Sequence, residues 1–375
     1  MRAYYLSILI SSLLLGFLTT GCQKKGADNS EFTGVKVHEL KFYENLPENK
    51  DLFLGMLAGL KYDDETQHLF IQDLARSAII EIDESSNVVN VFGSKGRGPG
   101  EVLHIENFFL SKEHLFIVDG EQFLINKYSR LDGQHISSLD YGELLNQIIS
   151  PLLPNTDMNN RPFVTLNETI LLPSQVDGKF LYQAINWNGD EIANIGELPT
   201  DCTATEDNDI IRSALESRNV PRRDLCLAFP VNDHSEPDEL YIVYSAIPKI
   251  AKYSLSGRKI WEQTIARTPE IDSLMIDLSN IVDNRPDYLE PVRKYITGRN
   301  SPNGDLYLFT FMNQNALNFQ RPMWIHQFDS EGGLINRYKI ASNGELFTNF
   351  AGIDFKRSRI LTATINDAEI RSYHF

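Results

Sequence analysis

Seven arginines outside the apolar runs of this 375-residue sequence are its clearest candidates for chemistry. They are Arg97, Arg161, Arg222, Arg223, Arg285, Arg299 and Arg321. A guanidinium group binds a carboxylate, sulfate or phosphate through two parallel hydrogen bonds. If the fold brings several of these arginines to one face, they form a site for an anionic ligand such as an acidic glycan. The alternative is that they pair with the 51 Asp and Glu residues of the chain.

The glycine-rich stretch Gly93–Gly100, GSKGRGPG, has the composition of a phosphate-binding loop but not its pattern. It lacks the terminal Lys-Ser/Thr, contains Pro99, and leads into an apolar strand rather than a helix. We therefore interpret this stretch as a structural turn.

No motif for a cofactor, a metal ion or an activated nucleophile stands out. The chain has no HExxH, CxxC, EF-hand or G-x-S-x-G pattern, and its eight histidines are dispersed. His104 lies next to an apolar strand, where it could reach a ligand or serve only the structure. Asp73 and Asp119 follow two similar strands, and we expect their carboxylates to cap the turns that come next.

The charge balance and composition limit the class of protein. A formal net charge of −16 is unlike that of a nucleic-acid-binding protein, which needs a dense positive stripe. Apolar runs are short, turns are frequent, and aromatic residues make up 10% of the chain. This profile favours β structure, and the chain is long enough to bury a large core.

Residues 1–21 have the pattern of a bacterial lipoprotein signal peptide. A positive charge precedes an uncharged apolar run at residues 6–18, which ends in the sequence LTTGC. This ending resembles a lipobox, in which Cys22 is lipidated and becomes the new N-terminus, although Thr19 departs from the usual Leu, Val or Ile. The alternative is an uncleaved membrane anchor, for which the run is short.

Residues 22–34 are polar and small, as expected of a tether between a lipid and a folded domain. We therefore expect a protein of the bacterial cell envelope that is lipid-anchored to the outer membrane. In that oxidising compartment Cys202 and Cys226 could form a disulfide that closes a loop. Two unrelated buried thiols are the alternative.

Six times along the chain the sequence repeats a strand, a turn, an alternating strand, a second turn and another strand. The first two repeats begin with HLFIQD at His68 and HLFIVD at His114, and the others begin near residues 169, 240, 306 and 360. Glycine in the second turn accepts a positive φ without strain. One further strand precedes each repeat, so each unit has the four strands of a β-propeller blade.

The sixth unit lacks its fourth strand, while Val35–Phe42 is a strand without a hairpin partner. We predict that Val35–Phe42 completes the last blade and closes an all-β, six-bladed ring over residues 35–375. The GRGPGE loop and the L-[FY]-I-x-D hairpins, behind a lipoprotein signal, resemble the six-bladed β-propeller lipoproteins of Bacteroidota, which are similar to NHL-repeat propellers. The resemblance implies the fold and little chemistry. Units three to five depart from it, because they lack the Asp after the second strand.

Strands of one blade alternate in direction, so the loops between blades all open on one face. Three long insertions, at about residues 141–166, 197–230 and 266–298, belong to that face. The apolar spacing within residues 207–217 and 269–282 predicts helices, which could cap a central channel. We expect the insertion face to carry the candidate ligand-binding residues Arg97, His104, Arg161, Arg285, Arg299 and Arg321.

The sequence therefore predicts a monomeric binding or scaffolding module for a glycan, peptide or protein partner. The alternative is a propeller hydrolase or lyase, either lactonase-like or metal-assisted. Glu101 and Glu106 lie near an inner strand and could serve such an enzyme. A Ca²⁺ or Zn²⁺ ion near the channel mouth, ringed by His or carboxylates, favours the enzyme. A dry channel and an exposed surface of arginines and aromatic side chains favour binding.

Overall fold

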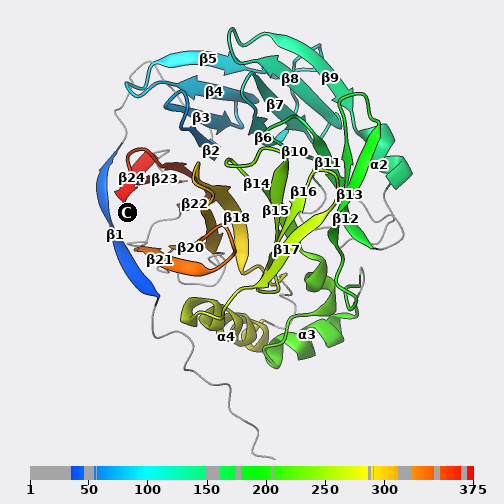
Figure 1. Ribbon diagram of the computed structural model, residues 1–375, viewed down its shortest axis with the longest axis vertical. Coiled ribbons are helices and arrows are strands. Elements are labelled where there is room, and N and C mark those ends of the chain that lie inside the picture. Colours follow the sequence, from blue (N-terminus) through cyan, green and yellow to red (C-terminus); the bar gives the residue numbers. More distant parts are fainter. Residues whose placement is uncertain are drawn as a thin grey trace, which may run out of the picture. The chain divides into compact units, whose positions relative to one another are not determined.

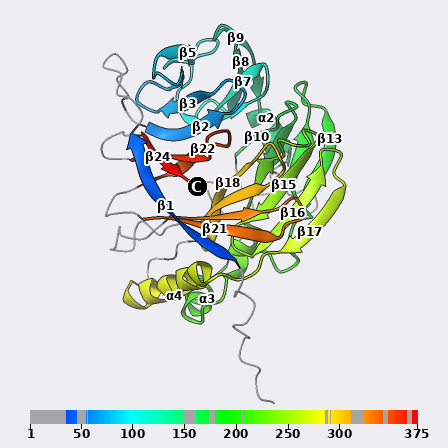
Figure 2. The same cartoon turned by 60° about the vertical axis from the view of Figure 1, so that its left-hand side comes forward.

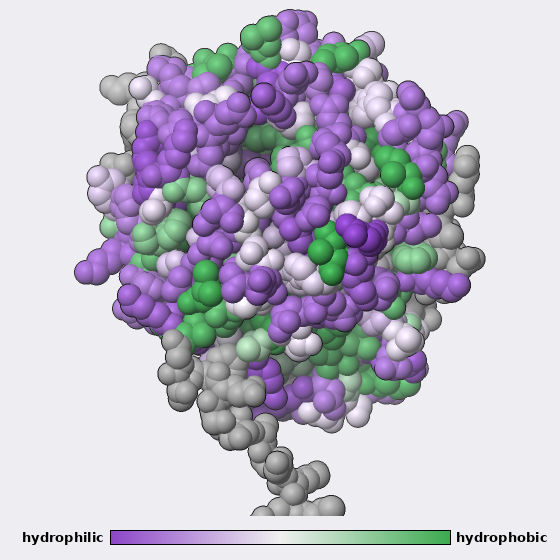
Figure 3. Space-filling view, viewed as in Figure 1, coloured by the Kyte–Doolittle hydropathy of each residue, from purple (hydrophilic) through white to green (hydrophobic). Residues whose placement is uncertain are grey.

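Buried apolar side chains fill the middle strands of each sheet, because neighbouring sheets cover both faces of these strands. In β3 (His68–Asp73) and β7 (His114–Asp119), every side chain after the first is buried. The edge strand β5 (Val88–Phe92) instead exposes all three of its valines. This decrease in burial toward the edge is what packing between two other sheets produces. Polar side chains cover most of the outer surface seen in Figure 3.

The computed structural model describes residues 35–45, 55, 57–148, 161–173, 179–203, 206–285, 289, 291–310, 323–341, 347–364 and 370–375. Val35–Phe375 forms one compact unit. Cys22 and Arg321 lie outside the described residues.

Within the described residues, four antiparallel sheets of four strands each follow one another along the chain (Figure 1). The first contains β2 (Leu57–Asp63), β3, β4 (Ala78–Ile82) and β5. The second contains β6 (Ile105–Leu110), β7, β8 (Leu124–Ser129) and β9 (His135–Asp140). The third contains β10 (Phe163–Val164), β11 (Ile170–Pro173), β12 (Phe180–Ile185) and β13 (Glu191–Glu197). The fourth contains β14 (Ala228–Asn232), β15 (Glu239–Tyr244), β16 (Lys249–Ser254) and β17 (Lys259–Thr264).

A fifth sheet of eight strands joins two blades through the first strand of the unit. Its first blade contains β18 (Tyr295–Asn300), β19 (Leu306–Thr310), β20 (Met323–Phe328) and β21 (Leu334–Ile340). Its second blade contains β22 (Phe347–Asp354), β23 (Arg359–Thr364) and β24 (Ile370–His374), and β1 (Lys36–Asn45) lies between the two. The prediction of an all-β propeller is confirmed.

Strand β1 changes its partner halfway along its length (Figure 2). Its residues Lys41–Asn45 pair antiparallel with β24, whose missing neighbour the repeat pattern had indicated. Its residues Lys36–Leu40 pair in parallel with β21, which no sequence feature predicted. Two parallel strands that are far apart in the sequence are not joined by a hairpin turn. The sequence near β1 therefore contains no local signal for its pairing with β21.

The first strand of each blade lies nearest the centre of the unit (Figure 1). Around this centre β2 contacts β22, β22 contacts β18, and β18 contacts β14, while β6 contacts β10. Side chains of these inner strands therefore come close to one another although they are far apart in the sequence.

The predicted helices are present, but they do not cover the centre. The helix α3 spans Asn208–Glu216 and α4 spans Pro269–Asn284, while the shorter α2 spans Gly142–Ile148. The N-caps are Asp207 and Thr268, whose side chains accept backbone N–H groups of the first turn. The apolar stripes of α3 and α4 pack on each other and on Ala246 and Val292. The two helices accordingly lie beside the sheets rather than over them (Figure 1).

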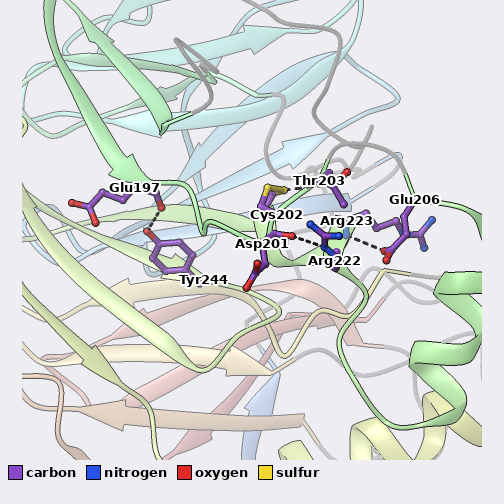
Figure 4. The surroundings of a disulfide bond; sticks show 9 residues. Glu197, Asp201, Cys202, Thr203, Glu206, Arg222, Arg223 and Tyr244 are labelled. Atoms are coloured by element: carbon purple, nitrogen blue, oxygen red, sulfur yellow. Dashed lines mark hydrogen bonds between the residues drawn. A yellow bond between two sulfur atoms is a disulfide. The ribbon is translucent and has the colours of Figure 1, made fainter.

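A disulfide between Cys202 and Cys226 closes the insertion that contains α3 (Figure 4). Cys226 ends the 3-10 helix η3 (Arg222–Cys226), in which Arg222 Nε donates to the Asp201 carbonyl at 3.1 Å. Arg223 Nη2 donates to the Leu289 carbonyl at 2.6 Å. Both arginines therefore hold the backbone of the insertions in place.

Buried Asp224 ties the same insertion to the segment before β18. Its carboxylate accepts the Val292 N–H at 2.8 Å and lies 3.2 Å from Arg223 Nε. Burial raises the pKa of Asp224 to about 6, while these two partners oppose the rise.

Glu270, in the first turn of α4, anchors this helix to the fifth sheet. Its carboxylate lies 2.7 Å from His326 Nε2 and 3.0 Å from Arg337 Nη1. His326 is fully buried, and its Nδ1 lies 2.8 Å from the Tyr295 hydroxyl oxygen. Burial opposes ionisation of Glu270, but the hydrogen bond to His326 and the charge of Arg337 lower its pKa.

Replacing Glu270 by Ala is expected to lower the free energy of unfolding by about 3 kcal/mol, because it leaves Arg337 and His326 buried without their acceptor. Urea denaturation measures this loss. The matched control is Glu39→Ala, because exposed Glu39 pairs with Lys339 at 3.3 Å and should cost less than about 1 kcal/mol. Equal losses in the two variants would contradict the anchoring role of Glu270.

Candidate anion-binding site

Lys61 reaches from the inner strand β2 toward the inner strand β6 of the next blade. Its ammonium donates to the Phe108 carbonyl oxygen and lies over the rings of Phe108 and Phe109, 4.7 and 4.3 Å from their centroids. Burial, followed by the charge of Arg299, lowers the pKa of Lys61 well below its usual value. No carboxylate contributes to this shift. Within the described part of the chain, the Lys61 amine therefore contacts neutral groups only.

Arg299 extends from the inner strand β18 toward the same place. Its Nη1 donates to the Gly298 carbonyl at 2.8 Å and to Thr297 Oγ1 at 3.3 Å, and its Nη2 donates to the Leu60 carbonyl of β2 at 3.5 Å. All these acceptors are neutral. Burial lowers the pKa of Arg299 to about 10, so the guanidinium keeps its charge at neutral pH.

His234 adds a third cationic or titratable group directly after the inner strand β14. Its backbone N–H donates to Asn300 Oδ1 at 2.8 Å, which holds it beside the end of β18. Its side chain is open to solvent, yet the surrounding protein and the charge of Arg299 lower its pKa. The charge of Arg299 therefore acts on both Lys61 and His234. Side chains from β2, β18 and the turn after β14 thus converge at the centre of the sheets.

The carboxylates near this cluster are already committed to other cations. Asp63 forms an ion pair with Arg130, and Asp233 forms one with Lys252 at 2.8 Å. Burial opposes ionisation of Asp63, but Arg130 outweighs it and lowers the pKa of Asp63. We call Lys61, His234 and Arg299 the central basic cluster, in which Arg299 keeps its charge at neutral pH.

The residues predicted for the insertion face, so far as the structure describes them, are placed in different surroundings. Arg299 lies in β18 rather than in a loop, and its neighbours are Leu60 and Lys61 at the centre. The third predicted insertion was extended to residue 298, although β18 begins at Tyr295. The reason is that Thr297-Gly298-Arg299 has no strand-like alternation of apolar residues. Arg285 is exposed at the C-terminal end of α4, and Arg97 is exposed in the loop between β5 and β6.

Arg161 and His104 lie near the start of inner strands. Arg161 Nη1 donates to the Glu106 carbonyl at 3.1 Å, and its Nε lies 3.9 Å from the Glu106 carboxylate. The backbone N–H of exposed His104 points to Asp119 Oδ1 at 3.4 Å. Arg161 is therefore neutralised by Glu106, unlike Arg299.

The glycine-rich loop is a structural turn, as predicted. Glu101 accepts the Gly98 N–H at 2.6 Å within the loop, and Tyr128 donates its hydroxyl to the Gly100 carbonyl at 2.8 Å. Gly93 has a φ of 81° and leaves 3.2 Å between an added Cβ and the Ser77 carbonyl oxygen, so a side chain there is strained.

Asp73 and Asp119 cap the turns after β3 and β7, which confirms the prediction made for them. Asp73 Oδ1 accepts the Ala75 N–H at 3.0 Å, and Asp119 Oδ1 accepts the Glu121 N–H at 2.9 Å. Asp119 Oδ2 also accepts the Leu103 N–H at 2.7 Å, which joins the turn to the segment entering β6.

Sequence reasoning missed Lys61 and His234. Lys61 ends an otherwise apolar stretch, LGMLAGLK, and a lysine within an inner strand is the one available signal. His234 follows β14 in the segment NDHSEP, which has the composition of an ordinary polar turn.

Chemically, the side chains of Lys61, Arg299 and His234 offer an amine, a guanidinium and an imidazole to an anion.

Two further searches concern the described residues only. No helix there is long and apolar enough to cross a membrane. In the same part of the chain, no group of three His, Cys, Asp or Glu side chains is arranged to hold a metal ion.

The chain resembles known propellers in sequence and in structure. Residues 82–219 match the family described as TolB-like 6-blade propeller-like. A member of the duf4221 family from Bacteroides vulgatus has a TM-score of 0.55 at 10% identity, over 90% of this chain and 97% of that one. A protein of Bacteroides fragilis that is described as exported has a TM-score of 0.52 at 12% identity, over 90% and 98%. No curated protein matches. At these identities the likeness shows the propeller fold alone.

Replacing Arg299 by Met is expected to raise the pKa of His234, because it removes the positive charge that lowers it. An NMR titration of the imidazole Cε1–H resonance measures the pKa, and His234→Gln assigns the signal. Arg97→Met, in an exposed loop, is the control and should leave the pKa unchanged. An unchanged pKa in Arg299→Met would show that the two side chains do not share one site.

Proposed function

We propose that this protein is a cell-envelope binding module that holds an anionic ligand, such as an acidic glycan, at the central basic cluster. One observation carries the proposal: the Lys61 amine and the charged Arg299 guanidinium are partly buried, and the acceptors described for them are neutral carbonyl and hydroxyl oxygens. Desolvation strengthens any charge-assisted hydrogen bond that these groups make to a ligand. An anion therefore gains more here than at an exposed arginine.

The arrangement favours binding over scaffolding alone. A scaffold surface needs no buried charge, and each uncompensated cation costs stability unless something offsets the desolvation. A bound carboxylate or sulfate group supplies that offset by accepting from Lys61 and Arg299 together. The lowered pKa of His234 lets it serve as a neutral donor or acceptor beside them.

Isothermal titration calorimetry with a short oligogalacturonate tests the proposal, with a neutral maltooligosaccharide and an acidic peptide of similar length as comparisons. Arg299→Met should weaken oligogalacturonate binding tenfold to a hundredfold, since it removes a charge-assisted hydrogen bond worth about 1.5–3 kcal/mol. Arg285→Met, an exposed arginine on α4, is the matched control and should bind as the unaltered protein does.

The proposal is wrong if the neutral oligosaccharide binds as tightly as the acidic one, or if Arg299→Met and Arg285→Met bind equally. If the acidic peptide binds more tightly than oligogalacturonate, the ligand is an acidic protein segment rather than a glycan. Thermal unfolding of each variant shows whether a loss of binding is only a loss of folding.

We further propose that residues 1–21 are a cleaved signal peptide, that Cys22 carries lipid, and that residues 22–34 tether the propeller to the outer membrane. The LTTGC ending supports this, and so does the fold of the Bacteroides fragilis protein described as exported. Two acyl groups on one residue give stable anchoring.

Metabolic labelling with an alkyne fatty acid should mark the unaltered chain, and Cys22→Ala should abolish the label and move the protein to the soluble fraction. Cys226→Ala controls for cysteine loss in general and should keep the label. Full labelling of Cys22→Ala would exclude lipidation at this residue.

A further inference from the structure

A cleft with a mainly cationic charged lining shares no residue with the central basic cluster. It has a volume of about 260 Å³ and opens between α4, the end of α3 and the fourth sheet. Its charged lining consists of Arg218, Arg267, Lys294 and Asp272. None of these four residues belongs to the central basic cluster, so a substitution in one site leaves the side chains of the other site in place.

The charges of the cleft do not cancel. Asp272 is bound to Arg267, with 2.9 Å between its carboxylate and Arg267 Nε. Within the described part of the chain, neither the Lys294 ammonium nor the Arg218 guanidinium has a hydrogen-bond or ion-pair partner. Lys294 is half-buried, so its ammonium is partly desolvated and oriented by the wall of the cleft. Apart from Asp272, the charged lining of the cleft therefore offers no acceptor to Lys294 and Arg218.

The cleft also has apolar lining residues, which are firmly held. Ile271 and Met275, one turn apart on α4, are buried and line the cleft together with Val220. Lys294 donates its backbone N–H to the Ser245 carbonyl at 2.8 Å, which fixes it to the fourth sheet. The Glu270 contacts hold α4 and the disulfide closes the α3 insertion. Binding therefore requires little ordering of the protein.

We propose that this cleft binds a small organic carboxylate whose apolar body packs on Ile271 and Met275 while its carboxylate accepts from Lys294. The volume lies just below the range of pockets for drug-sized ligands, which limits the ligand to about one ring or a short acyl chain. An inorganic anion leaves the apolar wall unused, and a neutral apolar molecule leaves Lys294 without an acceptor. Only a molecule with both parts satisfies the whole lining.

Titration of Lys294 gives the binding a pH dependence. Burial, followed by the charge of Arg267, lowers the pKa of Lys294 to about 8, and Asp272 opposes the shift. The ammonium is therefore present at pH 7 and is progressively lost above pH 8. Affinity for a carboxylate should fall over that interval, because the neutral amine attracts an anion less.

Benzoate is the probe, and its binding to the purified full-length chain can be followed by isothermal titration calorimetry at pH 7. Saturable binding is expected, with Lys294→Met weakening it at least tenfold. Arg285→Met, on the same helix but outside the cleft, is the matched control and should have no effect. Arg299→Met should also leave benzoate binding unchanged, so failure at one site is distinguishable from failure at the other.

Benzyl alcohol and inorganic phosphate separate the two halves of the proposal. Benzyl alcohol keeps the ring without the charge, phosphate keeps the charge without the ring, and both should bind at least tenfold more weakly than benzoate. Equal binding of either overturns the assignment of an organic carboxylate, as does undiminished benzoate binding by Lys294→Met.

Chemical modification gives a readout that does not depend on affinity. Reductive methylation followed by peptide mass mapping should modify Lys294 readily at pH 8, where about half of the amines are neutral. Benzoate should protect this residue and leave exposed Lys112 equally reactive. Equal reactivity of Lys294 with and without saturating benzoate would place the benzoate elsewhere.

Discussion

Every blade of this propeller has two apolar faces, and each face must be covered by a neighbouring blade. The apolar clusters accordingly run between sheets: Phe229 and Tyr241 of the fourth sheet pack with Leu308 and Phe328 of the next. This constraint orders the blades around a centre and brings their inner strands together. The central basic cluster is a consequence, because Lys61 and Arg299 come from different blades and meet only when those faces are buried.

The strand β1 meets the same constraint at the sheet edges. By pairing with both β24 and β21, it covers two edges whose free N–H and C=O groups would otherwise attract another chain. It also joins residues about 300 positions apart, as in the pairing of His38 with Tyr338. The beginning of the unit is thereby part of its last two blades, and the stability of those blades depends on it.

Charge is distributed unevenly in this acidic protein, and burial decides where it can act. Exposed arginines such as Arg97 and Arg285 are solvated by water, and Arg161 is neutralised by Glu106. Lys61, Arg299 and Lys294 are instead partly removed from water without a carboxylate bonded to them, and burial is the leading cause of each lowered pKa. The first two lie together between the inner strands, and the third lines a small cleft. The two proposed ligands differ because the apolar wall of Ile271 and Met275 adjoins only the cleft.

Local sequence determined the strands, their turns and the helices of the insertions, because alternation, glycine turns and helical spacing are properties of neighbouring residues. The repeat of HLFIQD and HLFIVD predicted the blade, and the unpaired strand Val35–Phe42 predicted a partner near the C-terminus. The tertiary structure alone decided which cations meet. Arg299 approaches Leu60 across 239 positions of sequence, and Lys294 and Ile271 share a cleft only because α4 folds back on the fourth sheet. Such distances depend on how the blades pack, and no residue pattern within one segment encodes them.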